Sequence, residues 1–178
     1  MQEARSEKLL FTPASPQADA VPLILSFPNQ YNVGITSLGY QVVWATLARR
    51  PDLQVSRLFT DTHEALPRSP ELVGFSFSWE LDYANILSLL EQLGIPVLAT
   101  ERGEDHPLIF GGGPVLSANP EPFAAFFDLI LMGDGEVVLS PFIDTYQALR
   151  QAPRGEKLQQ LAQVPGVYVP SLYVVTYQ

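Results

Sequence analysis

The sequence has 178 residues, 47% of them hydrophobic, which is enough to bury one sizeable core. Its formal net charge of −9 at pH 7, from 19 acidic and 10 basic residues, disfavours contact with nucleic acids and anionic membrane surfaces. The absence of cysteine excludes disulfides, thiolate nucleophiles and cysteine-ligated zinc or iron–sulfur clusters. The polar N-terminus, Met1 to Lys8, precedes no long apolar stretch, so we expect a cytoplasmic protein without signal peptide or transmembrane helix.

The first half of the chain alternates apolar runs with amphipathic segments. The run VPLILSF is typical of a strand buried on both faces of a parallel sheet. The next segment begins at Ser37, a residue type that favours helix N-caps, and ends before Pro51, which predicts a helix. In chain order, we expect an N-terminal arm at 1–20, a strand at 21–27, a helix at 37–50, strands at 54–60 and 72–78, and a helix at 80–93 that Gly94 ends.

The second half continues this alternation with shorter elements and more glycine. Gly111-Gly112-Gly113-Pro114 directly follows a short apolar strand, and Gly133 opens another glycine-containing loop before a helix. In chain order, we expect short strands at 95–99 and 108–110, a short helix at 121–127, a strand at 129–132, a helix at 133–151, a short helix at 157–163 and an apolar tail at 166–178.

Helices that alternate with apolar strands predict an α/β fold with a doubly wound parallel sheet, of the Rossmann or flavodoxin-like type, and helices on both faces. The pattern changes near residue 153, and the tail after Gly166 fits either an edge strand of this sheet or the opening of a second domain. We therefore divide the chain into an arm at 1–20, an α/β domain at 21–152 and a linker segment at 153–178.

Loops at the carboxyl edge of such a sheet are the expected place for a ligand, because they face one crevice. Four loops qualify, at 28–36, 76–82, 111–119 and 133–136. Their glycines permit positive φ and close backbone approach to a ligand, although the 111–113 run equally fits a tight turn that needs no ligand. Since neither GxGxxG nor GxxxxGK[ST] spacing is present, nicotinamide cofactors and nucleoside triphosphates lose support.

Several side chains near these loops have both an ordinary and a functional interpretation. Asp134 and Glu136 begin a predicted helix, where carboxylates cap free N–H groups; acid–base catalysis is the alternative. Trp79 and Tyr83 follow the third strand, where aromatic residues either pack in the core or line a crevice against a planar ligand. In each pair, the ordinary interpretation is our default.

Long stretches of the sequence resemble one known family, the radical S-adenosylmethionine (SAM) proteins with an N-terminal cobalamin-binding-like domain. The similarity runs from about Leu23 to Gln178, and its most specific part is the series ERGEDHPLIFGGGP, NPEP and GDGE. In the family, this domain precedes a barrel whose Cys-x-x-x-Cys-x-x-Cys loop holds a [4Fe-4S] cluster that cleaves SAM. The resemblance therefore implies that this chain is the non-catalytic N-terminal part of such an enzyme and that the barrel is its partner.

The resemblance also points to cobalamin (vitamin B12) as the ligand. In related members, a Gly-Gly-x-His segment and a Gly-Glu-Gly-Glu segment contact the corrinoid and its nucleotide tail, and they match 111–114 and 133–136 here. The match is incomplete, because Pro114 or Val115 stands where the His is expected and Asp134 replaces a Glu.

Another part of the cobalamin pattern is incomplete as well. Asp61 and His63 look like the start of the Asp-x-His-x-x-Gly signature, by which many cobalamin domains donate a histidine to cobalt. Leu66 replaces its Gly, and the motif follows the second predicted strand, whereas the signature follows the first. We therefore expect His63, and likewise His106, to be solvent-exposed loop residues without a metal.

Candidate cofactor-binding residues come from all four carboxyl-edge loops, and none is assigned a catalytic role. We expect backbone N–H groups of the glycine loops to point toward phosphate or amide groups of the cobalamin nucleotide tail. The candidates are Asn32, Gly34, Ser76, Ser78, Gly111, Gly112, Gly113, Pro114, Gly133, Asp134, Gly135 and Glu136.

Three functions follow as hypotheses. The first is a module that holds cobalamin for the catalytic barrel. The second is an interaction domain that kept the fold, lost the ligand and docks on the barrel or another protein; its crevice between the glycine loops should be filled by Phe or Trp side chains. The third is a self-contained enzyme that uses Asp134, Glu136, Glu80 and Asp82 as acids and bases or as a Mg²⁺ site, which requires these carboxylates to converge.

Overall fold

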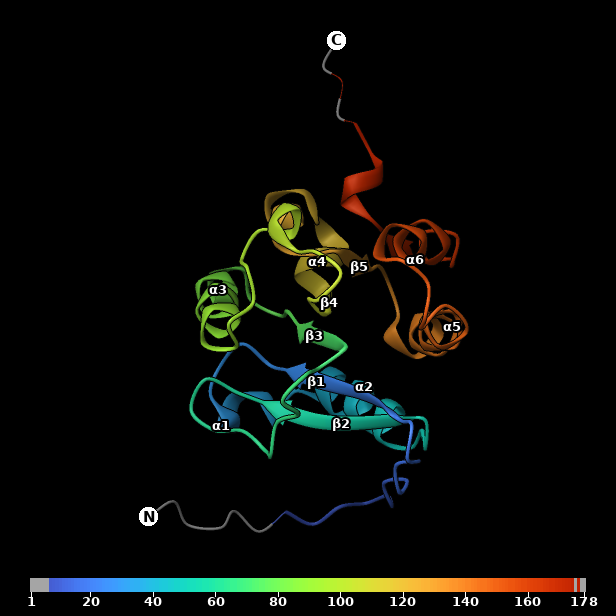
Figure 1. Ribbon diagram of the computed structural model, residues 1–178. Helices are drawn as coiled ribbons and strands as arrows, with labels where there is room; N and C mark the ends of the chain where they lie inside the picture. Colours follow the sequence, from blue (N-terminus) through green and yellow to red (C-terminus); the bar gives the residue numbers. More distant parts are fainter. Residues whose placement is uncertain (1–6, 175, 177–178) are drawn as a thin grey trace.

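Six strands form one sheet in the described part of the chain, residues 7–174 and 176 of a computed structural model (Figure 1). The strand order is β2-β1-β3-β4-β5-β6; β1 to β5 are parallel, and β6 pairs antiparallel with β5. The five parallel strands have the order of flavodoxin-like sheets, so the predicted doubly wound α/β fold is confirmed. The strands are β1 (Val21–Ser26), β2 (Leu53–Leu58), β3 (Leu72–Ser76), β4 (Leu108–Gly112), β5 (Leu129–Leu131) and β6 (Val167–Tyr168).

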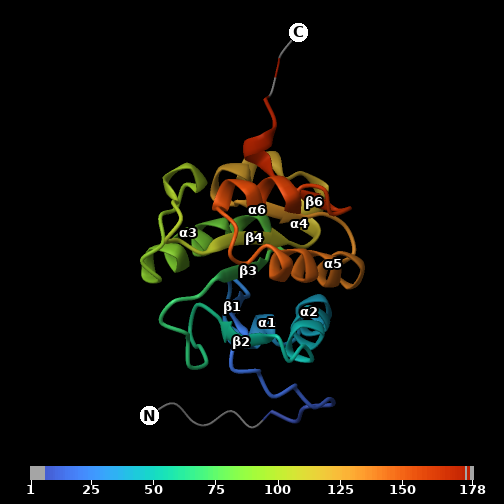
Figure 2. The same ribbon diagram turned by 45° about the vertical axis from the view of Figure 1, so that its right-hand side comes forward.

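Helices cover both faces of the sheet (Figures 1 and 2). Helices α2 and α5 pack on one face, with α6 against α5, and α3 and α4 pack on the other. The α-helices are α1 (Tyr31–Gly34), α2 (Leu38–Ala48), α3 (Tyr83–Gln92), α4 (Pro114–Ala118), α5 (Gly135–Ala148) and α6 (Arg154–Leu161). Short 3₁₀ helices are η1 (Glu80–Asp82), η2 (Ala99–Glu101), η3 (Glu121–Phe126) and η4 (Pro170–Leu172).

The strands are apolar throughout because neighbouring residues of one strand serve two different cores. In β1, Leu23 and Leu25 belong to the core beneath α2 and α5, whereas Ile24 belongs to the core beneath α3 and α4. All three side chains are almost completely buried. A strand covered on both faces has no polar side, which is why the run 21–27 lacks the alternation of a half-exposed strand.

Helix boundaries follow local signals that the sequence contains. The hydroxyl of Ser37 accepts a hydrogen bond from the Tyr40 N–H, and the carboxylate of Asp134 accepts one from the Glu136 N–H, so both residues cap their helices as expected. Gly94, at φ +69°, follows the end of α3 in the left-handed conformation that glycine adopts most readily. Local chemistry thus fixes where these three helices begin or end.

The predicted strand at 95–99 is wrong. The segment forms a loop that leads into η2, and β3 pairs directly with β4, so no place in the sheet is left for it. The carbonyl groups of Pro96 and Val97 accept hydrogen bonds from the guanidinium of Arg102, at 2.8 and 2.7 Å. Since proline also lacks an N–H, these residues are poorly suited to a strand ladder. The short helix α1, inside the predicted loop 28–36, was not expected either.

The end of the chain packs on the same core as the rest. Leu161, Val164, Val167 and Val169 join the core beneath α2 and α5, and Val167 begins the edge strand β6. Of the two interpretations of the tail, the structure therefore shows an edge strand at β6. The last residues of the predicted tail, 175, 177 and 178, lie outside the described residues, and the division of the chain near residue 153 stays a prediction.

The described part of the N-terminal arm lies against α2 and β2. The ring of Phe11 packs edge-on against Trp44 with centroids 5.1 Å apart, and Glu7 forms a 3.0 Å ion pair with Arg57. Positions 1–6 of the predicted arm fall outside the described residues. In the part of the chain that the structure describes, no helix has the length and apolar character needed to cross a membrane.

Candidate ligand-binding site

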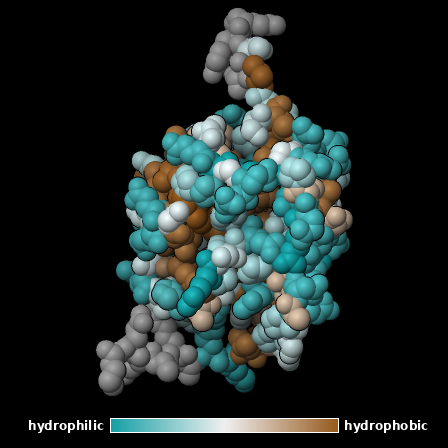
Figure 3. Space-filling model, in the orientation of Figure 1, coloured by the Kyte–Doolittle hydropathy of each residue, from teal (hydrophilic) through white to brown (hydrophobic). Residues whose placement is uncertain are grey.

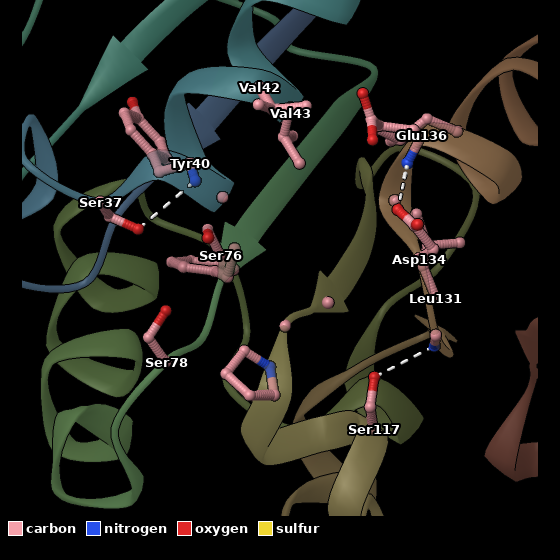
Figure 4. A pocket seen from close by; sticks show the side chains of 18 of the residues that line it. Ser37, Tyr40, Val42, Val43, Ser76, Ser78, Ser117, Leu131, Asp134 and Glu136 are labelled. Atoms are coloured by element: carbon pink, nitrogen blue, oxygen red, sulfur yellow. Dashed lines mark hydrogen bonds between the residues drawn. The ribbon is translucent and has the colours of Figure 1, made fainter.

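A cavity of about 620 Å³ opens at the carboxyl edge of the sheet, around the ends of β1, β3, β4 and β5 (Figure 4). It includes the point between β1 and β3 at which the strand order reverses, where doubly wound sheets bind their ligands. Its volume lies within the range of about 300–1,000 Å³ that is usual for small-molecule sites. Position and size therefore mark it as the candidate site.

Nine of the twelve candidate cofactor-binding residues line this cavity: Ser76, Ser78, Gly112, Gly113, Pro114, Gly133, Asp134, Gly135 and Glu136. Asn32, Gly34 and Gly111 do not. A Cβ at Gly34 would lie 2.7 Å from the ring of Phe59, and one at Gly111 would lie 2.5 Å from Leu116, so packing accounts for both glycines. The structure thus brings together parts of three of the four predicted loops, and no residue of the fourth, the loop 28–36, lines the cavity.

The largest group of lining residues that the sequence did not single out comes from the start of α2. These residues form the wall nearest β1, and Figure 4 shows Tyr40, Val42 and Val43 on that side of the cavity. The N-cap signal at Ser37 marks where α2 begins, and the first helix of a doubly wound fold starts at the carboxyl edge. The Ser37 signal was therefore sufficient to predict that the first residues of α2 lie at the cavity. The unpredicted lining residues are Leu25, Ser37, Leu38, Gly39, Tyr40, Val42, Val43, Phe75, Phe110, Ser117, Leu131 and Leu139.

Two glycines of the cavity have positive φ for different reasons. Gly113, at φ +114°, is the residue directly before α4, and a Cβ there would lie 2.5 Å from the carbonyl oxygen of Phe77, so close packing of two backbones requires glycine. Gly133, at φ +87°, has open space where its Cβ would be. Its N–H donates a 3.0 Å hydrogen bond to the Ser117 hydroxyl (Figure 4), which ties the β5–α5 loop to α4. That N–H is therefore already engaged within the protein.

The lining contains no Lys, Arg or His, and Asp134 and Glu136 are its two charged residues. Leu38 and Gly39 in α2, and Gly135 in α5, are first-turn residues, whose N–H groups lack an intrahelical acceptor. These N–H groups and the positive ends of the two helices are the cavity's available means of binding an acceptor or partial negative charge. The site therefore suits a mainly apolar ligand with amide-like polar groups better than a highly charged polyphosphate.

Aromatic side chains form part of the wall and leave the crevice open. Phe110 is buried against Phe142, with ring centroids 5.2 Å apart, and neither tryptophan lines the cavity. Tyr40 is completely buried, and its hydroxyl lies 3.4 Å from the carbonyl oxygen of Leu25, to which it donates. Burial raises the pKa of Tyr40 well above its usual value, so this wall is neutral. The crevice between the glycine loops is thus not filled by Phe or Trp.

The carboxylates of the third hypothesis do not converge. Asp134 and Glu136 line the cavity, whereas Glu80 and Asp82 do not. Asp82 is 7% exposed and accepts a 2.9 Å hydrogen bond from the Asn29 amide. Over residues 7–174 and 176, no group of three or more His, Asp or Glu side chains is arranged to hold a metal ion. The described residues therefore give no support to a carboxylate Mg²⁺ site.

The remaining candidates lie outside the cavity. Trp79 and Tyr83 are 66% and 43% exposed and do not line it, so they are neither core residues nor part of this crevice. His63 is exposed in the β2–β3 loop, as expected. His106, which was also expected to be exposed, is instead half-buried, because its ring packs into the loop and its Nδ1 accepts a 3.0 Å hydrogen bond from the Gly103 N–H. Neither histidine lines the cavity.

Comparisons with known proteins identify one family by its sequence profile. The sequence profile described as "Radical SAM proteins, N-terminal" matches residues 63–170. An uncharacterized protein of Methanocaldococcus jannaschii is 24% identical over 110 residues, which are 62% of this chain and 23% of that protein.

Solved structures with a similar fold come from a cobalamin-dependent SAM radical enzyme, OxsB. Its structures with aqua-cobalamin and SAM bound, and with aqua-cobalamin bound, each align at a TM-score of 0.50. Their sequences are 16% and 17% identical to this one, and each alignment covers 83% of this chain and 20% of that chain. The chain thus spans about a fifth to a quarter of the length of these relatives.

Proposed function

The chain belongs to the family of radical SAM proteins, as their N-terminal part, and we propose that it is a non-catalytic module that binds cobalamin in the cavity at the carboxyl edge of its sheet. The observation that carries the proposal is the open crevice of about 620 Å³ between the glycine loops. A domain that had lost its ligand is expected to fill this space with aromatic side chains, because unfilled apolar cavities destabilise a fold. The similarity in fold to OxsB, whose structures contain aqua-cobalamin, supports the same ligand.

The residues present fit a corrinoid in their chemistry. The ring is a large, mainly apolar surface that carries amide groups, and the cavity has apolar walls from Val42, Val43 and Leu131. The hydroxyls of Ser76 and Ser78 and the first-turn N–H groups of α2 and α5 are suitable partners for amides and for the phosphate of the nucleotide tail. Cobalamin, when bound, supplies a cobalt centre that carries a methyl group or an electron.

The same lining determines how the cofactor is held. Since no histidine lines the cavity, we expect no histidine of this domain to coordinate cobalt, and binding to depend on shape and backbone contacts. A ligand as large as cobalamin extends beyond the mouth of a cavity of this volume, so part of it remains accessible to a second domain. The protein's contribution is to hold and orient the cofactor and to shield one side of it from water.

The radical chemistry belongs to another part of the polypeptide. Without cysteine, this chain cannot hold a [4Fe-4S] cluster, and the matching family profile is that of the N-terminal part of radical SAM proteins, which supports a catalytic part downstream. We infer that the cluster and SAM are bound by that downstream part and that this chain would hold cobalamin for it. The cytoplasmic location and the absence of nucleic-acid contacts stay predictions.

Titration with hydroxocobalamin tests the proposal. We expect saturable changes in the visible spectrum and in calorimetric heat for the unmodified chain. A Cβ at Gly112 makes only ordinary contact with Leu131, 3.5 Å from its carbonyl oxygen, so Gly112→Trp keeps the backbone and places an indole in the cavity. Its affinity should fall at least about tenfold, which corresponds to ~1.4 kcal/mol.

Gly103→Trp is the matched control, because Gly103 is exposed, has open space around it and lies far from the cavity lining. It should bind cobalamin as the unmodified chain does, and far-UV circular dichroism should show that both variants are folded. Absence of saturable binding by the unmodified chain at high micromolar cobalamin would reject the proposal. The alternative, an interaction domain that kept the fold without the cofactor, would then stand.

A further inference from the structure

A second cavity, of about 580 Å³, lies between the N-terminal arm and α2. Its walls come from residues 7–11 of the arm, from one side of α2, and from Tyr31 and Ile35 at the two ends of α1. We call this cavity the arm groove. Figures 1 and 2 show the arm, in dark blue, passing α2 and β2. Since its volume lies within the usual range for small-molecule sites, about 300–1,000 Å³, the groove is large enough for a ligand.

The α2 wall of the arm groove is a stripe of mainly apolar side chains. Leu38, Val42 and Ala45 are three or four residues apart, so they lie above one another on one side of the helix. None of them belongs to the buried cores, and Leu38 is 74% exposed. A different side of α2, with Tyr40 and Leu47, packs on the sheet. Because a surface helix usually has a polar outer side, this apolar outer stripe indicates a surface that contacts an apolar group.

The arm borders the groove without filling it. The Phe11 ring packs on Trp44, with centroids 5.1 Å apart, and the Ala14 N–H donates a 2.8 Å hydrogen bond to the Ala48 carbonyl. Leu10, which lines the groove, is 91% exposed. Figure 3 shows hydrophobic surface among hydrophilic residues at the lower end of the molecule, where Figure 1 shows the arm. Apolar surface on both walls is thus left to be covered by a third apolar group.

Two cationic side chains line the arm groove, one on each wall. Lys8 belongs to the arm, and Arg49 directly follows α2. Within the described residues neither forms an ion pair, and the Arg49 guanidinium lies over the Phe11 ring, 4.9 Å from its centroid. The acidic Glu7 also lines the groove, but its charge is compensated by a 3.0 Å ion pair with Arg57. The groove therefore offers cations to an anionic group, whereas the lining of the cofactor cavity has no basic residue.

The arm groove and the cofactor cavity meet at the start of α2. Leu38, Val42 and Glu136 line both of them. Since Glu136 repels a negative charge at this end, an anionic group is favoured at the other end, where Arg49 lies. The stripe from Leu38 to Arg49 is about 16 Å long, from the helical rise per residue. This length and the distribution of charge suit an elongated ligand that is apolar at one end and anionic at the other.

We propose that the arm groove binds an elongated amphipathic monocarboxylate, with its carboxylate between Arg49 and Lys8 and its apolar part along the α2 stripe. A monoanion is favoured over a phosphate dianion, because the chain has a net charge of −9 and Glu136 lines the groove. The proposal does not rest on cobalamin binding. When both sites are occupied, the apolar end of the carboxylate lies at the wall that the groove shares with the cofactor cavity.

Fluorescence titration with decanoate, without cobalamin, tests the arm groove. The sequence has two tryptophans; Trp44 lines the groove and Trp79 does not, so the titration uses the Trp79→Phe variant. We expect a saturable change in the emission of Trp44. The affinity for decanoate should be at least about tenfold higher than that for decanol, which lacks the charge, or for acetate, which lacks the apolar chain.

Charge variants test the role of the two cations. The double variant Lys8→Gln and Arg49→Gln should lower the affinity for decanoate at least about tenfold and leave that for decanol unchanged. The double variant Arg68→Gln and Lys157→Gln is the matched control, because it removes the same charge at positions that do not line the groove. Equal affinities for decanoate and decanol before these changes would overturn the proposal, because the groove would then not recognise an anion.

Two phenylalanine variants decide where decanoate binds. Ala45→Phe places a phenyl ring in the arm groove, and Gly112→Phe places one in the cofactor cavity. Ala45→Phe should lower the affinity for decanoate at least about tenfold, and Gly112→Phe should leave it unchanged, with far-UV circular dichroism showing that both are folded. Loss of decanoate binding in Gly112→Phe alone, or the absence of any saturable change in the starting variant, would overturn the proposal. Either result would leave the hydroxocobalamin titration as a separate test of the cofactor cavity.

Discussion

The two edges of this sheet are built in opposite ways. At the amino edge, charged side chains are buried and paired: the Arg102 guanidinium is completely buried, and Asp128 lies between it and Arg154. At the carboxyl edge, the cavity contains no basic residue, and its polar groups are mostly hydroxyls and backbone N–H groups. At the amino edge, the buried charges are thus neutralised by partners within the protein. At the carboxyl edge, uncharged polar groups face the cavity, where a ligand could contact them.

At the amino edge, several charged side chains have a structural role. Asp128 accepts hydrogen bonds from the Ile109 N–H at 2.7 Å and from Arg102 at 3.2 Å, and it is 2.7 Å from Arg154. A second cluster joins Glu71 to Arg150 and to the Tyr146 hydroxyl. These contacts fix the starts of β3, β4 and β5 to α5 and α6. The comparison indicates that the stabilising ion pairs and the candidate binding cavity lie at opposite ends of the same strands.

The largest effect that this comparison predicts is at Asp128. Asp128→Ala leaves Arg102 and Arg154 without their carboxylate in the interior, so we expect the free energy of unfolding to fall by about 3–5 kcal/mol. Urea unfolding measures it. Asp144→Ala is the control: Asp144 is 64% exposed, and its partner Arg50 keeps Asp52, so a loss of no more than about 1 kcal/mol is expected. Similar losses for both variants would contradict the contrast between the edges.

A smaller effect is expected from backbone packing at the carboxyl edge. Gly113→Ala places a Cβ 2.5 Å from the Phe77 carbonyl oxygen at φ +114°, which should lower the free energy of unfolding by about 1–3 kcal/mol. Gly155→Ala, in open space on α6, should be neutral or slightly stabilising, because alanine favours helices. Chemical denaturation of both variants checks this. If Gly113→Ala were as stable as the unmodified chain, the close approach of the two backbones would not be what requires glycine.

A pH-dependent effect is expected at Asp82. Burial raises its pKa, although the Asn29 amide opposes this, and its Oδ2 has no hydrogen-bond partner in the described part of the chain. Because the pKa is higher in the folded than in the unfolded state, the stabilising contribution is complete below the unfolded pKa and is lost as pH rises through the folded pKa. Asp82→Asn should therefore gain stability relative to the unmodified chain between about pH 4 and about pH 7.

Urea unfolding at the two pH values measures the Asp82 effect. Asp61→Asn is a suitable control, because the Asp61 side chain is exposed. A difference between Asp82→Asn and the unmodified chain that stays constant with pH would show that Asp82 titrates alike in the folded and unfolded states.

The smallest effect is expected at the histidines. His63→Ala should leave cobalamin affinity and the visible spectrum of the complex unchanged, because His63 is exposed in the β2–β3 loop and does not line the cavity. The measurement is the hydroxocobalamin titration already described, with His106→Ala beside it. A spectral change with His63→Ala alone would mean that the loop moves to the cofactor and that the resemblance to the Asp-x-His-x-x-Gly signature is functional.

Much of this structure was predictable because its signals are local. The apolar run of β1, the N-caps Ser37 and Asp134, and Gly94 at the end of α3 act within a few residues, and each is observed as expected. The strand predicted at 95–99 failed for the opposite reason: the carbonyls of Pro96 and Val97 bond to a guanidinium that is buried by contacts with residues 126 and 128. No local pattern encodes that contact.

By itself, the sequence determined the α/β class, the alternation of strands and helices, the family and the glycine loops at one edge, because periodicity, caps and glycine positions act over short distances. Only the tertiary structure decided which glycines face a cavity. In the folded chain, Gly112 and Gly133 line the cavity, whereas Gly34 and Gly111 are packed against neighbouring side chains. The start of α2 forms one wall of the cavity. The physical reason is that successive residues of a strand point to opposite faces, and which face is hollow depends on helices far away in the sequence.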